Sequence, residues 1–225
     1  MVIKELDKLA DTKKAKVVAK YFKTGKGEYG EGDVFIGVTV PDMRAVALSY
    51  TVTPLPEIQK LIQSSIHEHR FTALLILTYQ PLTKEIYDFY LNNTAYVNNW
   101  DLVDVSASLI VGKYLFDKKK NILKLLAKSK SIWERRIAIV ATHYFIKQHD
   151  LDTPLEIAEL LLDDAHDLMH KAVGWTLREI GKVDEERLVE FLHTHKKRIR
   201  RTTLRYAIER FSPDERKTFM AFPYI

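Results

Sequence analysis

Residues 132–148 read IWERRIAIVATHYFIKQ, and their apolar side chains recur at steps of three and four residues. This period matches the 3.6-residue turn of an α-helix that buries one face. PLEIAELLLDD (154–164) shows the same period, and so does most of the chain. The exception is KTGKGEYGEGDVFIG (23–37), which holds five of the eight glycines and predicts a loop. We find no hairpin signal and no alternation of strands with helices, so the sequence predicts a nearly all-α protein.

The helical segments repeat along the chain. Five of them align: EHRFTALLIL (68–77), WDLVDVSASL (100–109), WERRIAIVAT (133–142), HKAVGWTLRE (170–179) and RRTTLRYAIE (200–209). The register positions 70, 103, 136, 171 and 201 are separated by 33, 33, 35 and 30 residues. Such a period is typical of an α-solenoid of HEAT or armadillo type, because a two-helix hairpin needs a neighbour to bury its apolar face. We expect a single HEAT-like repeat domain over residues 1–225.

Most of these register positions carry a positive charge. The basic ones are Arg70, Arg136, Lys171 and Arg201, and the exception is Val103. Equivalent positions of a superhelix face the same surface, so we expect the cations to line one concave, basic wall, which would suit phosphates. The alternative is a set of ion pairs scattered between helices.

Charge is also uneven along the chain. Residues 1–112 carry 12 basic and 13 acidic side chains, whereas residues 113–225 carry 23 and 17. The densest basic stretch is HKKRIRRTTLRYAIER (195–210), in which Lys197, Arg201 and Arg205 recur every four residues and would share a helix face. Such a stripe suits phosphates, although a solvated helix face has the same pattern.

The composition excludes several classes of protein. The chain has 225 residues, of which 46% are hydrophobic and none is cysteine, so disorder, a disulfide scaffold, thiolate metal sites and thiol nucleophiles are excluded. MVIKELDKLADTKKAK (1–16) lacks the apolar run of a signal peptide or membrane helix, so we expect a cytoplasmic protein with no membrane partner. HDLMH (166–170) and the His67-Glu68-His69 triplet have no evident third ligand, so we expect neither a metal nor a cofactor.

Two groups of residues interrupt the repeat. Trp100 and Asp104 lie four residues apart and share a helix face, so a carboxylate stands close to where other repeats have a cation. Lys171, Trp175 and Arg178 form one stripe, and an aromatic between two cations suits a nucleic-acid backbone. Ordinary core packing is the alternative for both tryptophans.

These same segments resemble a known family. WDLVD (100–104), IWERRIAI (132–139), HKAVGWTLRE (170–179) and RTTLRYAIER (201–210) resemble the AlkD family of DNA alkylation repair proteins, which are HEAT-like alkylpurine DNA glycosylases. The resemblance implies a monomeric, nucleoid-associated enzyme that wraps duplex DNA. It would excise cationic alkylated purines, such as 3-methyladenine and 7-methylguanine, without extruding the lesion into a pocket.

The resemblance also implies roles for individual residues. Trp100 and Asp104 match the family's aromatic and catalytic carboxylate, and Trp175 matches its second aromatic wall. The residues matching DNA-backbone contacts are Arg136 and Arg178, and Tyr21 matches a tyrosine near the lesion strand. We expect the neighbouring Asp101 to pair with an arginine and orient its loop.

The chemistry agrees with these roles. Alkylation at N3 or N7 makes the purine a cation that departs neutral, so the remaining barrier lies in the positive charge that develops on the sugar. An ionised Asp104 would stabilise that charge and position the attacking water, and the indole faces of Trp100 and Trp175 would assist. The alternative is a catalytically silent HEAT-repeat module that binds DNA structures or acts as a protein scaffold.

Overall fold

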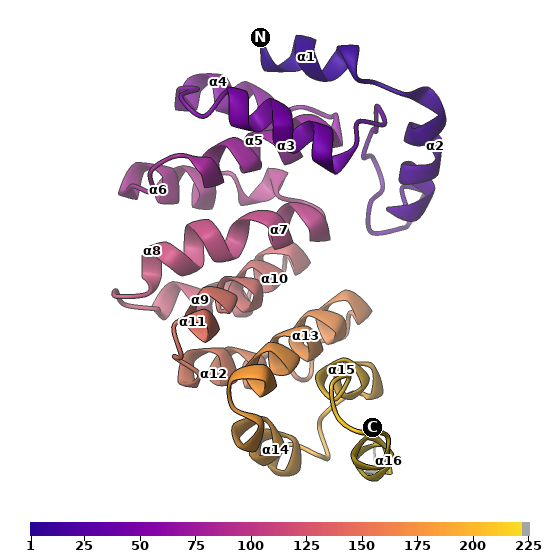
Figure 1. The fold of residues 1–225 in the computed structure, drawn as a ribbon, viewed down its shortest axis with the longest axis vertical. Helices are drawn as coiled ribbons and strands as arrows, with labels where there is room; N and C mark the ends of the chain where they lie inside the picture. Colours follow the sequence, from indigo (N-terminus) through magenta and orange to yellow (C-terminus); the bar gives the residue numbers. More distant parts are fainter. Residues whose placement is uncertain (222–225) are drawn as a thin grey trace. The chain divides into compact units, whose positions relative to one another are not determined.

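The computed structural model describes residues 1–221, and helices account for nearly all of its regular structure (Figure 1). Over this range the one β pairing is an isolated bridge between Val34 and Ile66, so the all-α prediction is confirmed. Within the same residues, none of the helices combines the length and the apolar character that a membrane span requires.

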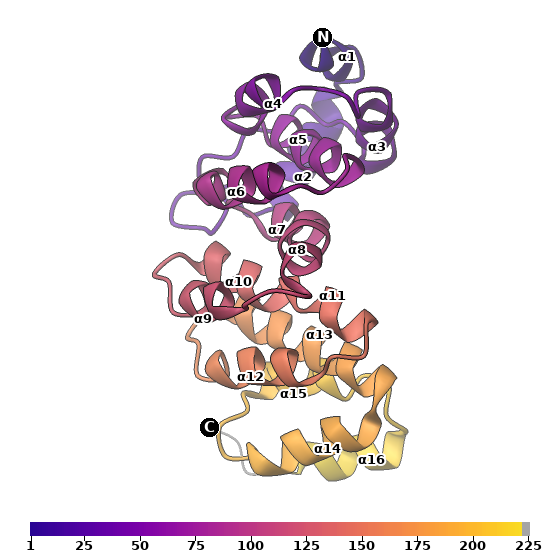
Figure 2. The ribbon, with the colours of Figure 1, turned by 90° about the vertical axis from the view of Figure 1, so that its left-hand side faces the viewer.

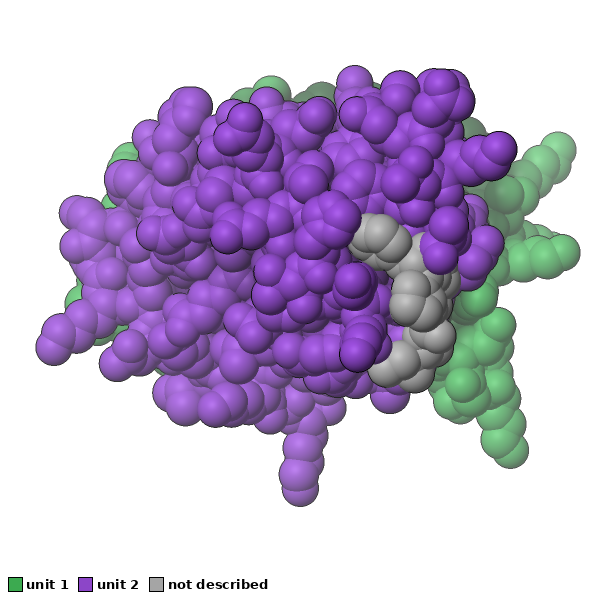
Figure 3. All heavy atoms as spheres, turned by 90° about the horizontal axis from the view of Figure 1, so that it is seen from below, with its two compact units in different colours: residues 1–106 green, residues 107–225 purple. Residues whose placement is uncertain are grey.

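The chain forms two compact units, residues 1–106 and residues 107–225 (Figure 3). The helices that begin in the first unit are α1 (Val2–Lys8), α2 (Thr12–Tyr21), α3 (Val40–Ser49), α4 (Leu55–Ile62), α5 (His67–Tyr79), α6 (Lys84–Asn92), η1 (Thr94–Tyr96) and α7 (Trp100–Ala107). The second unit contains η2 (Ser108–Gly112), α8 (Lys113–Leu115), α9 (Asn121–Ala127), α10 (Ile132–Ala141), α11 (His143–Lys147), α12 (Asp152–Leu160), α13 (Asp167–Val183), α14 (Glu185–Thr194), α15 (Arg201–Ala207) and α16 (Pro213–Met220). That the repeats form a single domain stays a prediction.

The first unit is organised around α5. Every residue from His67 to Leu77 is buried, including the four polar residues of the first turn. Helices α3 and α4 pack on α5, and α1 packs on α3 and α5. Helix α2, in contrast, has no fully buried residue. The glycine-rich residues 23–37 form the predicted loop.

The second unit repeats a helical hairpin. Helices α10, α13 and α15 pack in succession, with α9 against α10 and with α12 and α14 against α13 (Figures 1 and 2). Two glycines allow the backbones to approach closely. A Cβ atom on Gly112 would lie 2.1 Å from the carbonyl oxygen of Ala141, and one on Gly174 would lie 2.5 Å from that of Thr203. No larger residue fits either position without displacing the neighbouring backbone.

The turns that precede α5, α10 and α13 fix the register of these three repeat helices. In each of these turns one residue accepts two hydrogen bonds. Its side-chain oxygen accepts from the backbone amide two residues later, and its backbone carbonyl accepts from the side chain six residues later. These pairs are Ser64 with Arg70, Ser129 with Arg135, and Asp164 with His170. Arg70 is therefore equivalent to Arg135 and His170, and the predicted equivalence with Arg136 and Lys171 is wrong by one residue.

Counting from the first residue of each repeat helix gives the same register for these three helices and extends it to α7 and α15. The fifth residues of the repeat helices α5, α7, α10, α13 and α15 are Phe71, Asp104, Arg136, Lys171 and Arg205. Asp104 thus occupies the same helical position as three cations. The sequence alignment puts Val103 at the register position of α7, whereas the structure puts the carboxylate itself there.

Candidate nucleic-acid interface

Trp100 and Asp104 occupy the first and fifth positions of α7. Leu102 and Val103 are fully buried, and this burial fixes which face of α7 points into the unit. Trp100 and Asp104 are both partly exposed. Because residues four apart lie one above the other on a helix, the indole and the carboxylate share the partly exposed face.

The indole of Trp100 belongs to an aromatic cluster that also contains Tyr21, Phe22 and Phe35. The ring of Phe22 lies parallel to the indole, with a centroid separation of 5.1 Å and an interplanar angle of 7°. Tyr21 meets the same indole edge-on at 6.2 Å and is 67% exposed. Phe22 is buried and also contacts Phe35 at 5.1 Å. The cluster therefore supports one side of Trp100 and presents Tyr21 to solvent beside it.

Asp101 points to a histidine rather than to the expected arginine. Its Oδ2 lies 2.8 Å from Nε2 of His67, and Nδ1 of the same ring lies 3.0 Å from Oδ2 of Asp33. The predicted arginine partner is therefore wrong. His67 is 2% exposed, so this contact lies inside the first unit.

Two of the predicted phosphate-binding arginines are buried. Arg70 is 4% exposed, pairs with Asp33 and donates to the carbonyl of Ser64 at 2.7 Å. Arg136 is 5% exposed and donates to the carbonyl of Leu168 at 2.9 Å. Arg70 and Arg136 therefore hold the fold together through internal hydrogen bonds, and their burial argues against contacts with DNA phosphates. It also argues against the predicted line of cations on one wall.

In the second unit, Trp175 is partly exposed and rests on a buried histidine. Its Nε1 donates to Glu179 at 3.1 Å, and the ring of His143 meets the indole edge-on at 4.2 Å. His143 is itself fixed by a 2.8 Å hydrogen bond between Nε2 and the hydroxyl of Thr176. The orientation of Trp175 is thus set by groups within its own unit.

His143 makes the stability of the second unit sensitive to acid. Burial lowers the pKa of His143 to about 3, whereas an unfolded histidine titrates near 6.5. Below that value the unfolded chain binds a proton that the folded chain excludes, so we expect stability to fall as pH falls. The loss from this group is on the order of 3 kcal/mol by about pH 4.5.

Thermal melts of the protein and of His143→Gln test this expectation. Glutamine can still hydrogen bond to Thr176 but does not titrate, so its melting temperature should fall less between neutral pH and about pH 4.5. Equal falls in the two proteins would contradict a neutral, buried His143.

The remaining predicted cations of the second unit are accessible to different degrees. Lys171 is half-exposed and pairs with Asp167 at 2.7 Å. Arg178 pairs with Glu209, and its Nε lies 3.7 Å from Glu179. Ion pairs at a surface contribute little to stability, so a phosphate can replace these carboxylates at small cost.

The basic stripe predicted for residues 195–210 is shorter than expected. Lys197 lies in the turn between α14 and α15, so its predicted place on a shared helix face is wrong. The turn forms because the amides of Arg198 and Ile199 both donate to the carbonyl of His195. Arg201 and Arg205 do share α15 and are exposed. With residues of α15, its C-terminal turn and α16, they line a cleft of about 490 Å³; the others are Tyr206, Ile208, Glu209, Arg216 and Met220.

The family model for the DNA alkylation repair enzyme matches residues 2–211. The chain belongs to this family. The resemblance inferred from the sequence is therefore confirmed, and membership of the DNA alkylation repair family supports a role in DNA repair with DNA as the partner.

Solved structures of similar fold carry related descriptions. A predicted DNA alkylation repair enzyme from Enterococcus faecalis superposes with a TM-score of 0.71 and 18% identity, covering 91% of this chain and 97% of that one. AlkD2 from Streptococcus mutans gives a TM-score of 0.59 and 18% identity, covering 88% and 97%. No curated protein sequence matches the chain. At this identity the two structures establish the fold alone, which is the nearly all-helical repeat architecture predicted from the sequence.

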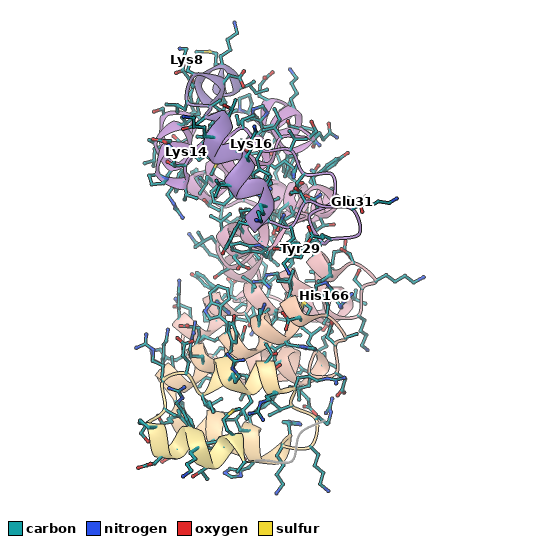
Figure 4. The ribbon with its side chains drawn as sticks, turned by 90° about the vertical axis from the view of Figure 1, so that its right-hand side faces the viewer. Lys8, Lys14, Lys16, Tyr29, Glu31 and His166 are labelled. Atoms are coloured by element: carbon teal, nitrogen blue, oxygen red, sulfur yellow. The ribbon has the colours of Figure 1, made fainter. Side chains whose placement is uncertain are left out.

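Helix α2 of this family member carries exposed lysines that the sequence did not single out. The exposed lysines of this helix that form no ion pair with a described residue are Lys13, Lys16 and Lys20. Figure 4 labels Lys16 and also Lys14, which pairs with Asp11. Counting charge over half of the chain concealed them, because residues 1–26 hold eight lysines and only three acidic residues. A shorter window would have detected the cluster.

No group of three histidine or acidic side chains suited to a metal ion occurs within residues 1–221. The two histidines of HDLMH have structural partners: His166 caps α13 by accepting from the amide of Leu168, and His170 bonds the carbonyl of Asp164.

Proposed function

We propose that this protein is a DNA glycosylase that removes N3- or N7-alkylated, positively charged purines from duplex DNA. One observation carries the proposal. Asp104 is a partly exposed carboxylate on the same helix face as Trp100, at a position that two other repeat helices fill with the surface cations Lys171 and Arg205. A carboxylate in that position would oppose phosphate binding, so its presence beside an aromatic ring favours a catalytic role.

The proposed reaction is hydrolysis of the N-glycosidic bond. The bond between the anomeric carbon and the base nitrogen breaks, and its electron pair stays with the base, which leaves neutral. Water forms the new carbon–oxygen bond and releases its proton to solvent. Asp104 stabilises the positive charge that develops on the sugar and orients the water, where little bulk solvent screens the interaction.

The aromatic residues supply contact with the deoxyribose. The indole of Trp100 is held by the parallel ring of Phe22, so the indole face opposite Phe22 has a fixed orientation. Such a face attracts a developing cation. We assign a similar contact to Trp175, whose indole is fixed by His143 and Glu179. Because Trp100 is partly exposed on a helix face, this mechanism needs no pocket for an extruded base.

The cations that we propose for DNA binding are those at the surface. They are Lys171, Arg178, Lys197, Arg201 and Arg205 in the second unit, and Lys13, Lys16 and Lys20 in the first, with Tyr21 beside Trp100. Arg70 and Arg136 are left out because they are buried. Phosphate contacts of this kind give affinity for any duplex, and the charge on the alkylated base gives selectivity.

Chromatography of the bases freed from methylated duplex DNA tests the proposed function directly. We expect release of 7-methylguanine and 3-methyladenine in the presence of a chelator, and no release from unmethylated DNA. Tight binding of duplex without base release would instead indicate a silent DNA-binding module. Absence of DNA affinity would indicate a protein scaffold.

A further inference from the structure

A buried network of hydrogen bonds joins three separate segments of the first unit. His67, the first residue of α5, contacts Asp33 of the glycine-rich loop at 3.0 Å and Asp101 of α7 at 2.8 Å. The side-chain Nδ2 of Asn99 donates to the same Asp33 oxygen, Oδ2, at 3.0 Å. We call these residues and Arg70, which pairs with Asp33, the His67 network.

The charges of this network balance. Each ring nitrogen of His67 faces a carboxylate, and only the doubly protonated imidazolium can donate to both. Burial disfavours that charged form, but the hydrogen bonds to Asp101 and Asp33 outweigh it and raise the pKa of His67 to about 9. With Arg70, the network holds two cations against two carboxylates, which satisfies the condition for burying charge.

The network reaches Trp100 from its backbone side and from its ring side. On the backbone side, Asn99 accepts a hydrogen bond from the amide of Trp100 at 2.8 Å, and Asp101 is the next residue. On the ring side, the imidazole of His67 lies 5.1 Å from Phe22, and Phe22 stacks on the indole. The same imidazole stacks on Phe35 at 4.5 Å. His67 thus contacts Phe22, which stacks on the indole, and Asp101, the residue next to Trp100.

We propose that His67 is a positioning residue for the excision reaction, because it ties Asp33 to Asp101 and thereby fixes the start of α7, where Trp100 and Asp104 lie. This inference rests on the proposed function. His67 is 2% exposed and does not itself reach the substrate. A loss of this bridge would let the first turn of α7 and the aromatic cluster move relative to each other.

The chain offers a matched control for a test of this role. His69 is also on α5 and is 3% exposed, but its Nδ1 bonds Ser64 at 2.9 Å and its Nε2 lies 4.0 Å from Asp7 of α1, so the polar partners that the described residues give it lie outside α7. We expect His67→Gln to lower the single-turnover excision rate at saturating protein by about 10- to 100-fold, because small errors in catalytic geometry are costly. Its Kd for methylated duplex should stay within about twofold of the parent, because the phosphate contacts are untouched. His69→Gln should excise at the parental rate, even if its melting temperature falls as far as that of His67→Gln.

A double-mutant cycle tests whether the bridge acts as one unit. Asp101→Asn should lower the excision rate, and combining it with His67→Gln should cause little further loss, because either change already breaks the bridge. Additive losses, or a parental excision rate in His67→Gln, would overturn the proposal. An equal loss of excision rate in His67→Gln and His69→Gln would also overturn it.

Fluorescence separates this inference from the proposed function. With Trp133 and Trp175 replaced by phenylalanine, Trp100 is the remaining tryptophan of the three. In that background His67→Gln should increase acrylamide quenching of Trp100, whereas His69→Gln should not. If no variant releases a base, the glycosylase proposal fails, and the quenching result still decides whether His67 positions Trp100. Unchanged quenching in His67→Gln would overturn the inference.

Discussion

Asp104→Asn should reduce the release of 7-methylguanine from methylated duplex DNA by at least about 100-fold. Asparagine preserves the size of the side chain and removes the negative charge. The developing positive charge on the sugar then loses its stabilising partner, and the attacking water loses its acceptor. DNA affinity should be equal or higher, because a carboxylate near phosphates opposes binding.

Single-turnover excision and duplex binding, measured on the same preparation, check this prediction. Asp117→Asn is a suitable control, since it makes the same chemical change at an exposed surface position. Full excision by Asp104→Asn would remove Asp104 from the mechanism. A parallel loss of affinity and excision would mean that the substitution disturbs α7 rather than the chemistry.

Replacing Lys13, Lys16 and Lys20 together by alanine should weaken binding to any duplex by about 10- to 100-fold at low salt. These three side chains have no carboxylate partner in the described part of the chain, so no ion pair has to break when they approach phosphates. If all three contact phosphates, the slope of log Kd against log salt should decrease by about 2 to 3. Titrations at several salt concentrations measure both quantities.

A second triple variant controls for net charge. Lys8, Lys60 and Lys124 are each paired with a glutamate, and their replacement by alanine removes the same number of positive charges. We expect a clearly smaller change in salt slope from this variant. If the two triples lower affinity and slope alike, binding depends on overall charge and α2 is not a specific contact surface.

The fold was largely predictable because hydrophobic periodicity and repetition are local properties. Residues 132–148 have the helical period that the structure confirms for α10 and α11. The register within the repeat was not predictable to one residue. Arg135 and Arg136 are adjacent and equally basic, and only the hydrogen bond from Arg135 to the carbonyl of Ser129 shows which of them is equivalent to Arg70.

The candidate site was predictable where it depends on one helix and not where it depends on distant segments. Trp100 and Asp104 share a face because they are four residues apart. The burial of Arg136 depends on a carbonyl 32 residues away, at Leu168. The role of His67 depends on Asp33 and Asp101, each 34 residues distant, so a sequence pattern that suggested only a weak metal pair gave no sign of it.

The close contacts made by Gly112 and Gly174 have the same spacing in sequence. Each glycine precedes the carbonyl that it touches by 29 residues, at Ala141 and Thr203, and the tyrosine that completes each contact, Tyr144 or Tyr206, follows three residues later. Because a side chain at either glycine would displace the neighbouring backbone, the shared interval marks two places in the second unit where one helix lies in direct backbone contact with the next. A change of chain length between glycine and carbonyl would therefore misplace both partners.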